Sequence, residues 1–146
     1  MSTRADILDR IRSSTLQGAP LRRQATQLLS TLPKYNWCGI YRLEGDTLVL
    51  DEYVGEVTEH TRTRVGQGVC GTAVAENKNQ VIDDVNALGN YLACSISTKS
   101  EIVVLIRRHG EILGQIDVDG HEVGAFDESD EKFLEEIARA LAEHWE

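Results

Sequence analysis

The sequence has 146 residues, which is the size of one domain built around one core. Its 41% hydrophobic and 27% charged residues exclude disordered, collagen-like and disulfide-scaffold proteins. A net charge of −9 disfavours nucleic acid as a partner. Neither a membrane-spanning apolar run nor a signal-like start is found, so we expect a cytoplasmic protein without membrane partners.

Apolar residues at helical spacing predict two amphipathic helices near the N-terminus, over 3–16 and 21–32. From residue 36 the pattern changes, and the segments 36–43 and 47–55 predict a β-hairpin closed by a Glu-Gly-Asp turn. The next segment, 66–77, begins with closely spaced glycines and continues as a predicted small-residue helix.

Residues 80–85 predict a short strand, and residues 86–100 predict a long irregular loop. A second hairpin is expected over 101–108 and 111–120, with its turn at His109-Gly110. The last predicted helix, 127–146, has an apolar stripe that includes Trp145, which hints at a homodimer.

Together these elements predict a single α+β domain with a central antiparallel sheet of about six strands flanked by helices. Within residues 1–146 we expect N-terminal helices over 3–32, the sheet and the site loops over 36–120, and the C-terminal helix.

The three cysteines are too few for a secreted disulfide framework, and no C-x-x-C pair or clustered histidine set predicts a metal or cofactor site. Cys38 shares a strand face with Ile40, so core packing is expected for it. Cys70 is placed at a helix start, where the thiolate is favoured, and Cys94 in the irregular loop. Both are either reactive thiols or small buried apolar groups.

Three acids stand in unexpected places. Asp117 and Asp119 are two residues apart on a predicted strand whose other members are typical of a buried strand. Glu101 begins the partner strand, so the hairpin brings all three carboxyl groups to one end. They either face solvent there, or form a site for a cationic or protonatable small molecule.

Six segments together resemble the GAF-domain free methionine-(R)-sulfoxide reductases in order and spacing: NWCGIY (36–41), GQGVCGTA (66–73), DV (84–85), ACSISTKSEIVV (93–104), LGQIDVD (113–119) and FDESDEKFL (126–134). The resemblance spans about residues 34 to 140 and implies a GAF-like sandwich. It also implies reduction of free methionine-(R)-sulfoxide to methionine, with a thioredoxin-like dithiol as the reductant.

Position by position, Cys94 matches the catalytic cysteine of that family and Cys70 a second redox cysteine. The three acids Glu101, Asp117 and Asp119 match its acidic pocket, and Trp37 matches an aromatic wall at the methyl end of the substrate. His60 stands where the family usually has a third cysteine. The resemblance therefore implies a Cys94 sulfenic acid that is resolved as a Cys70–Cys94 disulfide.

Two other functions remain open at this point. A non-catalytic GAF sensor of a small ligand is one, although the Asn-Lys typical of cyclic-nucleotide GAF domains is replaced by DVDG at 117–120. A thiol redox switch that uses Cys70 and Cys94 without a substrate is the other.

Overall fold

The computed structural model describes residues 3–88 and 97–146. Its sheet has six strands in the order β3-β2-β1-β6-β5-β4, and all neighbouring strands are antiparallel. The elements in chain order are α1 (Arg4–Arg12), α2 (Ala19–Leu29), β1 (Trp37–Glu44), β2 (Thr47–Val54), β3 (Arg62–Arg64), α3 (Gly68–Glu76), β4 (Gln80–Ile82), the 3-10 turn η1 (Val85–Ala87), β5 (Ser100–Arg108), β6 (Glu111–Gly120) and α4 (Glu128–Glu143). The predicted α+β fold with an antiparallel sheet is confirmed.

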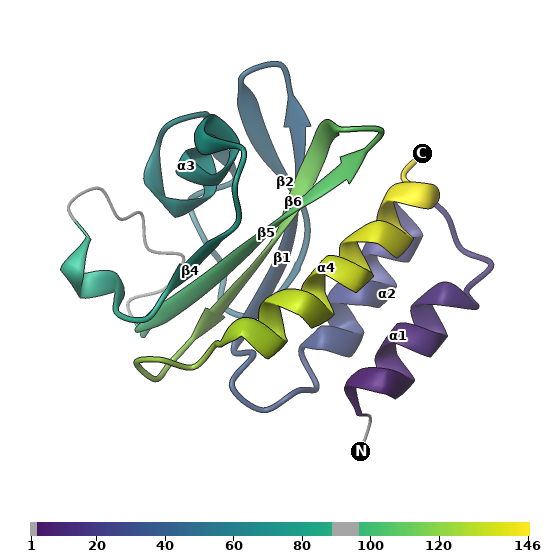
Figure 1. Cartoon of the computed structure of the whole chain (residues 1–146), viewed down its shortest axis with the longest axis horizontal. Coiled ribbons are helices and arrows are strands. Elements are labelled where there is room, and N and C mark those ends of the chain that lie inside the picture. The colour runs from purple at the N-terminus through teal and green to yellow at the C-terminus, as the bar shows by residue number, and fades with distance from the viewer. Residues whose placement is uncertain (1–2, 89–96) are drawn as a thin grey trace.

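The sheet separates two apolar cores of unequal size. The larger core lies between the sheet and α1, α2 and α4, and the smaller one lies under α3 on the other face (Figure 1). Alternation along β1 divides its side chains between them, because Cys38 and Ile40 belong to the larger core whereas Trp37 and Tyr41 belong to the smaller. The expected core position of Cys38 is therefore confirmed.

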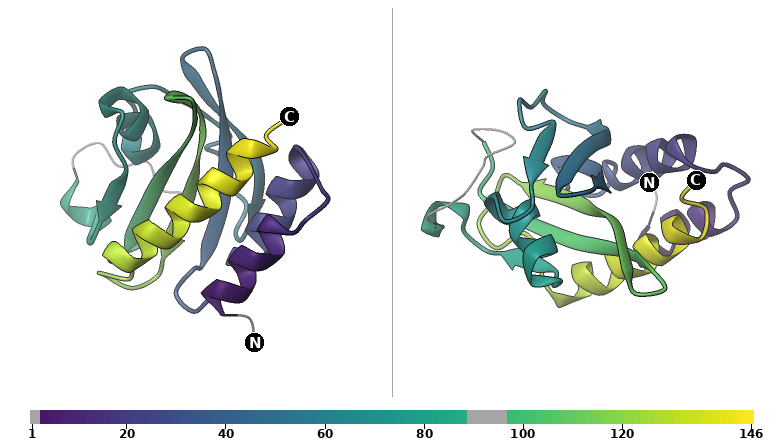
Figure 2. Two further views of the ribbon diagram at one scale, coloured as in Figure 1. Left: turned by 45° about the vertical axis from the view of Figure 1, so that its right-hand side comes forward. Right: turned by 90° about the horizontal axis from the view of Figure 1, so that it is seen from above.

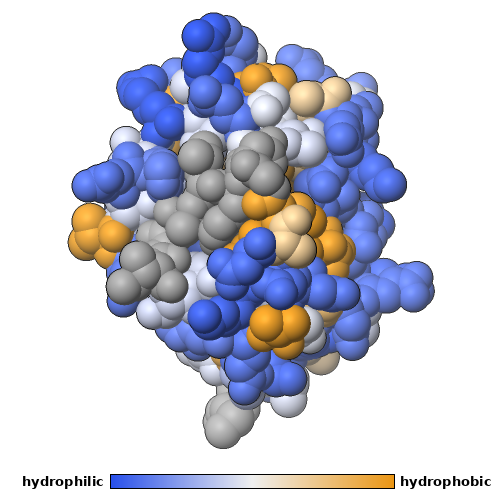
Figure 3. Space-filling model, turned by 90° about the vertical axis from the view of Figure 1, so that its left-hand side faces the viewer, coloured by the Kyte–Doolittle hydropathy of each residue, from blue (hydrophilic) through white to orange (hydrophobic). Residues whose placement is uncertain are grey.

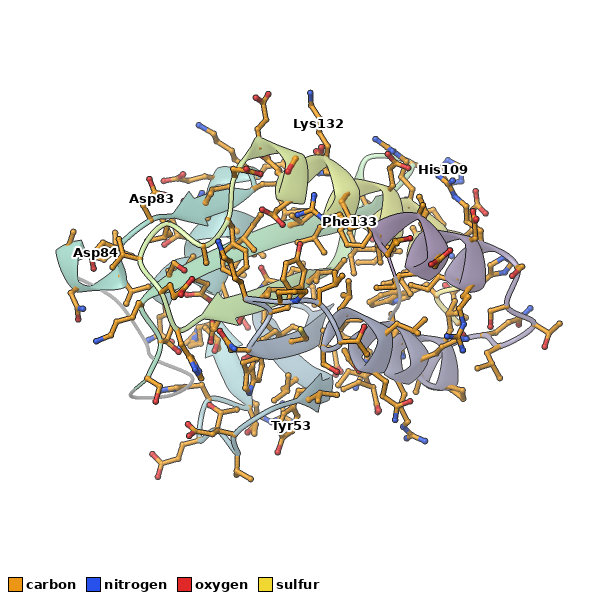
Figure 4. The ribbon with its side chains drawn as sticks, turned by 90° about the horizontal axis from the view of Figure 1, so that it is seen from below. Tyr53, Asp83, Asp84, His109, Lys132 and Phe133 are labelled. Carbon is orange, nitrogen blue, oxygen red and sulfur yellow. The ribbon has the colours of Figure 1, made fainter. Side chains whose placement is uncertain are left out.

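The first and last helices start with the same device. In α4 the side chain of Asp127 accepts from the backbone N–H of Asp130, whose carboxylate accepts in return from the N–H of Asp127. A matching capping box starts α1. Behind the cap of α4, Phe133 points into the core while its neighbour Lys132 points away from the molecule (Figure 4). Figure 2 shows α1 and α4 side by side, where Arg4 pairs with Asp130.

The predicted helix over 3–16 is too long. Helix α1 ends at Arg12, and Leu16, which the apolar pattern placed on the buried stripe, is 41% exposed in the connection to α2. Helix α2 begins at Ala19, with Pro20 in its first turn, and ends at Leu29. Both shorter helices still bury apolar side chains in the larger core, α2 against β1 and β2, and α1 against α2 and α4.

Trp145 contacts its own chain. Its ring lies 4.4 Å from the guanidinium carbon of Arg22, and its backbone oxygen accepts a hydrogen bond of 2.6 Å from the same group. Arg22 is buried and also pairs with Asp51 of β2 at 2.5 Å. The intramolecular packing accounts for the apolar stripe at this residue, so Trp145 no longer supports a homodimer.

None of the helices in residues 3–88 and 97–146 combines the length and the apolar character that a membrane crossing requires. Figure 3 shows the end of the molecule at the left of Figure 1, where hydrophilic side chains surround small groups of apolar ones. The exposed large apolar residues in the described chain include Val57, Val81 and Val123.

Candidate active site

The β5–β6 hairpin brings the three acids together as the sequence predicts. Its register pairs Glu101 with Asp119 and Val103 with Asp117, so the three carboxyl groups lie near one end of the strands. Figure 4 shows the turn at His109 at the opposite end of the molecule from Asp83, which follows β4. The solvent-facing alternative for the acids is wrong, because Glu101 is 2% exposed and both aspartates are 0% exposed.

Burial and mutual repulsion change the proton affinity of this cluster. Burial raises the pKa of Glu101 well above its ordinary value of 4.5, and the negative charges of Asp117 and Asp119 raise it further. Hydrogen bonds to the two aspartates act in the same direction. A proton held by the cluster therefore reduces the cost of burying three carboxyl groups together, and a bound cation would do the same.

Helix α3 carries Cys70 into contact with the acids. The Cys70 Sγ lies 3.3 Å from Asp117 Oδ2 and 4.0 Å from Glu101 Oε2. The Cys70 sulfur and one carboxyl oxygen from each acid lie within 4.8 Å of one another. They are close enough to act as ligands of one small cation. Cys70 is in the first turn of α3, as expected, but the neighbouring carboxyl groups oppose a negative charge on its sulfur until a cation joins them.

Two residues, Gly71 and Gln115, determine how closely α3 packs on the sheet. A Cβ on Gly71 would lie 2.4 Å from the backbone oxygen of Arg64, so only glycine lets α3 pack this closely on β3. From below, the side-chain amide of Gln115 on β6 donates a 3.4 Å hydrogen bond to the backbone oxygen of Cys70. The position of Cys70 therefore depends on contacts with two strands.

A pocket lies beside the acids and Cys70. Its lining comes from β1, the connection between β2 and β3, β3 itself, the start of α3, and β5, and includes Tyr41, His60, Thr63, Gln67, Cys70 and Glu101. The hydroxyl of Tyr41 donates to the backbone oxygen of His60 at 3.1 Å, which joins two walls of the pocket. Glu101 and Cys70 thus line a narrow pocket, and Asp117 contacts Cys70 beside it.

Two residues that the sequence predicts for the site, Cys94 and Trp37, are not found in the pocket lining that the structure describes. Cys94 lies outside the described residues. Trp37 is 1% exposed on the same sheet face as Tyr41, stacks on Tyr53 at 5.6 Å, and donates from Nε1 to the backbone oxygen of Glu56. The aromatic side chain in the described pocket lining is Tyr41, so the role of Trp37 stays a prediction.

Sequence reasoning missed part of the pocket wall. The strand Arg62–Arg64 was not predicted, because one buried residue between two exposed arginines gives too short an alternation to detect. Thr63 of that strand and Gln67 were missed with it. Tyr41 was placed on the correct face from strand alternation, but its place in the pocket depends on where α3 packs.

Glu101→Gln is expected to raise stability at neutral pH. Between the ordinary pKa and the raised one, the folded protein holds a proton that the unfolded chain has released, so wild-type stability falls as the pH rises through that interval. Glutamine resembles the protonated acid and removes this loss. Thermal unfolding at about pH 7 should show a Tm about 2–4 °C higher for each kcal/mol gained.

The same variant should also show a flatter dependence of Tm on pH above the ordinary glutamate pKa of 4.5, where the wild-type cluster keeps its proton. Glu131→Gln, on the half-buried face of α4, is the matched control, and it should leave the wild-type slope in place. An unchanged slope together with a lower Tm for Glu101→Gln would contradict the proton-holding cluster.

Comparison with known proteins agrees with this geometry. The GAF domain family model matches residues 21–146. The chain is 39% identical over 123 residues to the Escherichia coli protein named free methionine-R-sulfoxide reductase, which covers 84% of this chain and 74% of the relative. The solved type II free methionine-R-sulfoxide reductase of Thermoplasma acidophilum is 39% identical, with a TM-score of 0.82 over 96% of this chain and 95% of its own.

A third similar structure is that of the Staphylococcus aureus protein fRMsr in complex with its substrate. It is 30% identical, with a TM-score of 0.90 over 100% of this chain and 97% of its own. Similarity of this extent covers the sheet, the helices and every described residue of the acidic cluster. The chain therefore belongs to the GAF-domain family, in the group that contains the free methionine-R-sulfoxide reductases.

Proposed function

We propose that this protein reduces free methionine-R-sulfoxide to methionine. The observation that carries the proposal is the buried set of Glu101, Asp117 and Asp119 around Cys70 at the edge of a pocket. Relatives named for this activity support it. The carboxyl groups can bind the ammonium group of a free amino acid. A methionine inside a peptide has no such group.

In the first chemical step Cys94 is the nucleophile. Its thiolate attacks the sulfoxide sulfur, and a carboxyl group that still holds a proton donates it to the sulfoxide oxygen as the S–O bond breaks. The oxygen leaves as hydroxide and adds to the Cys94 sulfur, the bond between Cys94 and the substrate sulfur breaks, methionine departs with the electron pair of that bond, and Cys94 becomes a sulfenic acid. The raised pKa of Glu101 supports its cluster as the source of the proton.

In the second step the sulfenic acid is converted into a disulfide that an external thiol can reduce. The Cys70 sulfur attacks the sulfenic sulfur of Cys94, a disulfide forms, and the hydroxyl leaves as water with one proton. A disulfide requires Cα atoms within roughly 7 Å, so residue 94 must approach the start of α3. An external dithiol of the thioredoxin class then reduces the disulfide and releases both thiols.

The two roles of the acids are compatible through their charge. Ionised carboxylates bind the ammonium, while the one that keeps its proton acts as the acid. Before the substrate binds, the negative charge of the same carboxylates disfavours a thiolate on Cys70 or on any sulfur that approaches it. The arriving ammonium neutralises part of this charge, so substrate binding itself favours the thiolate form.

The proposal is tested with racemic free methionine sulfoxide and dithiothreitol, followed by chiral analysis of the remaining substrate. We expect the R-sulfoxide to disappear and the S-sulfoxide to remain. A methionine sulfoxide in the middle of a short peptide should react at least about tenfold more slowly, because a charge-assisted hydrogen bond to the ammonium is lost. Equal rates on the peptide would contradict recognition of a free amino acid.

A ligand-binding sensor is the alternative that the same assay separates. It would bind methionine sulfoxide at the acids without turnover, even with excess dithiol. Calorimetry that finds binding, together with chiral analysis that finds both sulfoxides intact, would replace the reductase by the sensor.

A further inference from the structure

The pocket has an acidic side and a side that carries His60. Glu101 and Cys70 line one side, and the acids beside them are the group assigned to the substrate ammonium. His60 is half-buried in the wall formed by the connection between β2 and β3. Its backbone is fixed twice, because its N–H donates to Thr58 Oγ1 at 3.0 Å and its oxygen accepts from Tyr41 at 3.1 Å.

A free amino acid carries a carboxylate as well as an ammonium. The acidic side of the pocket repels that carboxylate, so the group must lie at another part of the wall and needs a donor or a positive charge there. Among the described lining residues, His60 is the one whose side chain can carry a positive charge near neutral pH.

The start of α3 adds to the same effect. Gln67 is its N-cap residue and Gly68 its first residue, and both line the pocket with His60. Backbone N–H groups in a first helical turn have no partner within the helix and form the positive end of its dipole. The wall around His60 therefore favours an anion, whereas the wall around Glu101 favours a cation.

We infer that the imidazole of His60 binds the carboxylate of the free amino acid substrate and so sets specificity for an unblocked C-terminal end. The inference rests on the proposed function and adds a second determinant to it, since the acids recognise the ammonium. A side chain that only maintains the fold of this wall would not distinguish substrates by their carboxylate.

The test compares two substrates in two proteins. Free methionine-R-sulfoxide has both charges, and methioninamide sulfoxide keeps the ammonium but has a neutral amide in place of the carboxylate. For wild type, the amide should have a KM about tenfold higher than the free acid, because a charge-assisted bond is lost. In His60→Gln the KM for the free acid should rise by about the same factor, while the KM for the amide stays within about twofold of wild type.

Two further variants keep the result interpretable. His60→Lys retains a positive charge and should restore part of the preference for the free acid. His121→Gln changes an exposed histidine in the loop before α4 and should behave as wild type with both substrates. Equal loss on both substrates in His60→Gln, or no change on either, would overturn the carboxylate assignment.

A failure of the proposed function has a different signature. Wild type would then leave both substrates intact, and the same comparison would be made by calorimetry with L-methionine and L-methioninamide. Tighter binding of L-methionine that His60→Gln abolishes would support the carboxylate site without turnover. Equal affinities for the two compounds in wild type would overturn it.

Discussion

Cys94→Ser is expected to abolish reduction of methionine sulfoxide. A serine hydroxyl at this position is far less nucleophilic than a thiolate, and it cannot become a sulfenic acid. Cys38→Ser is the matched control, because Cys38 is fully buried in the larger core, where burial raises its pKa far above the ordinary value of 9.0. This control should lose stability but keep its turnover.

Peptide mapping follows the fate of the oxidised sulfur. After one equivalent of substrate without a reductant, wild type should contain a Cys70–Cys94 disulfide. In Cys70→Ser the reaction should stop after one turnover, with a sulfenic acid on Cys94 that a dimedone reagent labels. Turnover in Cys94→Ser would contradict the nucleophile, and a persistent sulfenic acid in wild type would show that Cys70 does not resolve it.

Gly114→Ala is expected to cause a large loss of stability, because its Cβ would make the shortest contact with a backbone atom among the glycines whose surroundings the structure describes. Gly114 pairs with Arg42 across β1 and β6, and a Cβ there would lie 2.0 Å from the backbone oxygen of Tyr41 and 3.1 Å from the ring of Trp145. A backbone atom cannot move aside as a flexible side chain does. We expect a cost of about 3 kcal/mol, which thermal unfolding would record as a Tm about 6–12 °C lower.

Gly45→Ala provides the comparison for that result. Gly45 has a φ of +63°, and a Cβ there meets open space, so its substitution costs conformational strain without a clash, about 1 kcal/mol. Equal Tm losses for the two variants would mean that the contact with Tyr41 is relieved by a small shift of the strands.

The acidic cluster was predictable because it depends on local geometry. A turn at His109-Gly110 brings the far ends of β5 and β6 together, as the sequence predicts. The pairing of Glu101 with Asp119 on one face also needs a bulge between Ile106 and Arg107, which shifts the register by one residue and is not visible in the sequence. The last helix was predictable for a similar reason, since its apolar stripe and the cap at Asp127 are both visible in consecutive residues.

The pocket wall was less predictable because it depends on contacts between segments distant in sequence. Tyr41 and Cys70 meet at the pocket only when α3 packs on β3, β5 and β6, and spacing along the chain does not report that packing. The short strand β3 is specified by its pairing with Leu48 and its neighbours rather than by its own three residues.

The two faces of the sheet differ in what they contribute to the protein. The three-helix face holds the larger core, so most of the apolar burial that stabilises the fold lies away from the pocket. The α3 face contributes less burial and carries His60, Cys70 and the acids. A substitution at a half-buried position of the pocket wall, such as position 60, therefore removes little of the burial that stabilises the fold, so ligand preference can change there while the scaffold is kept.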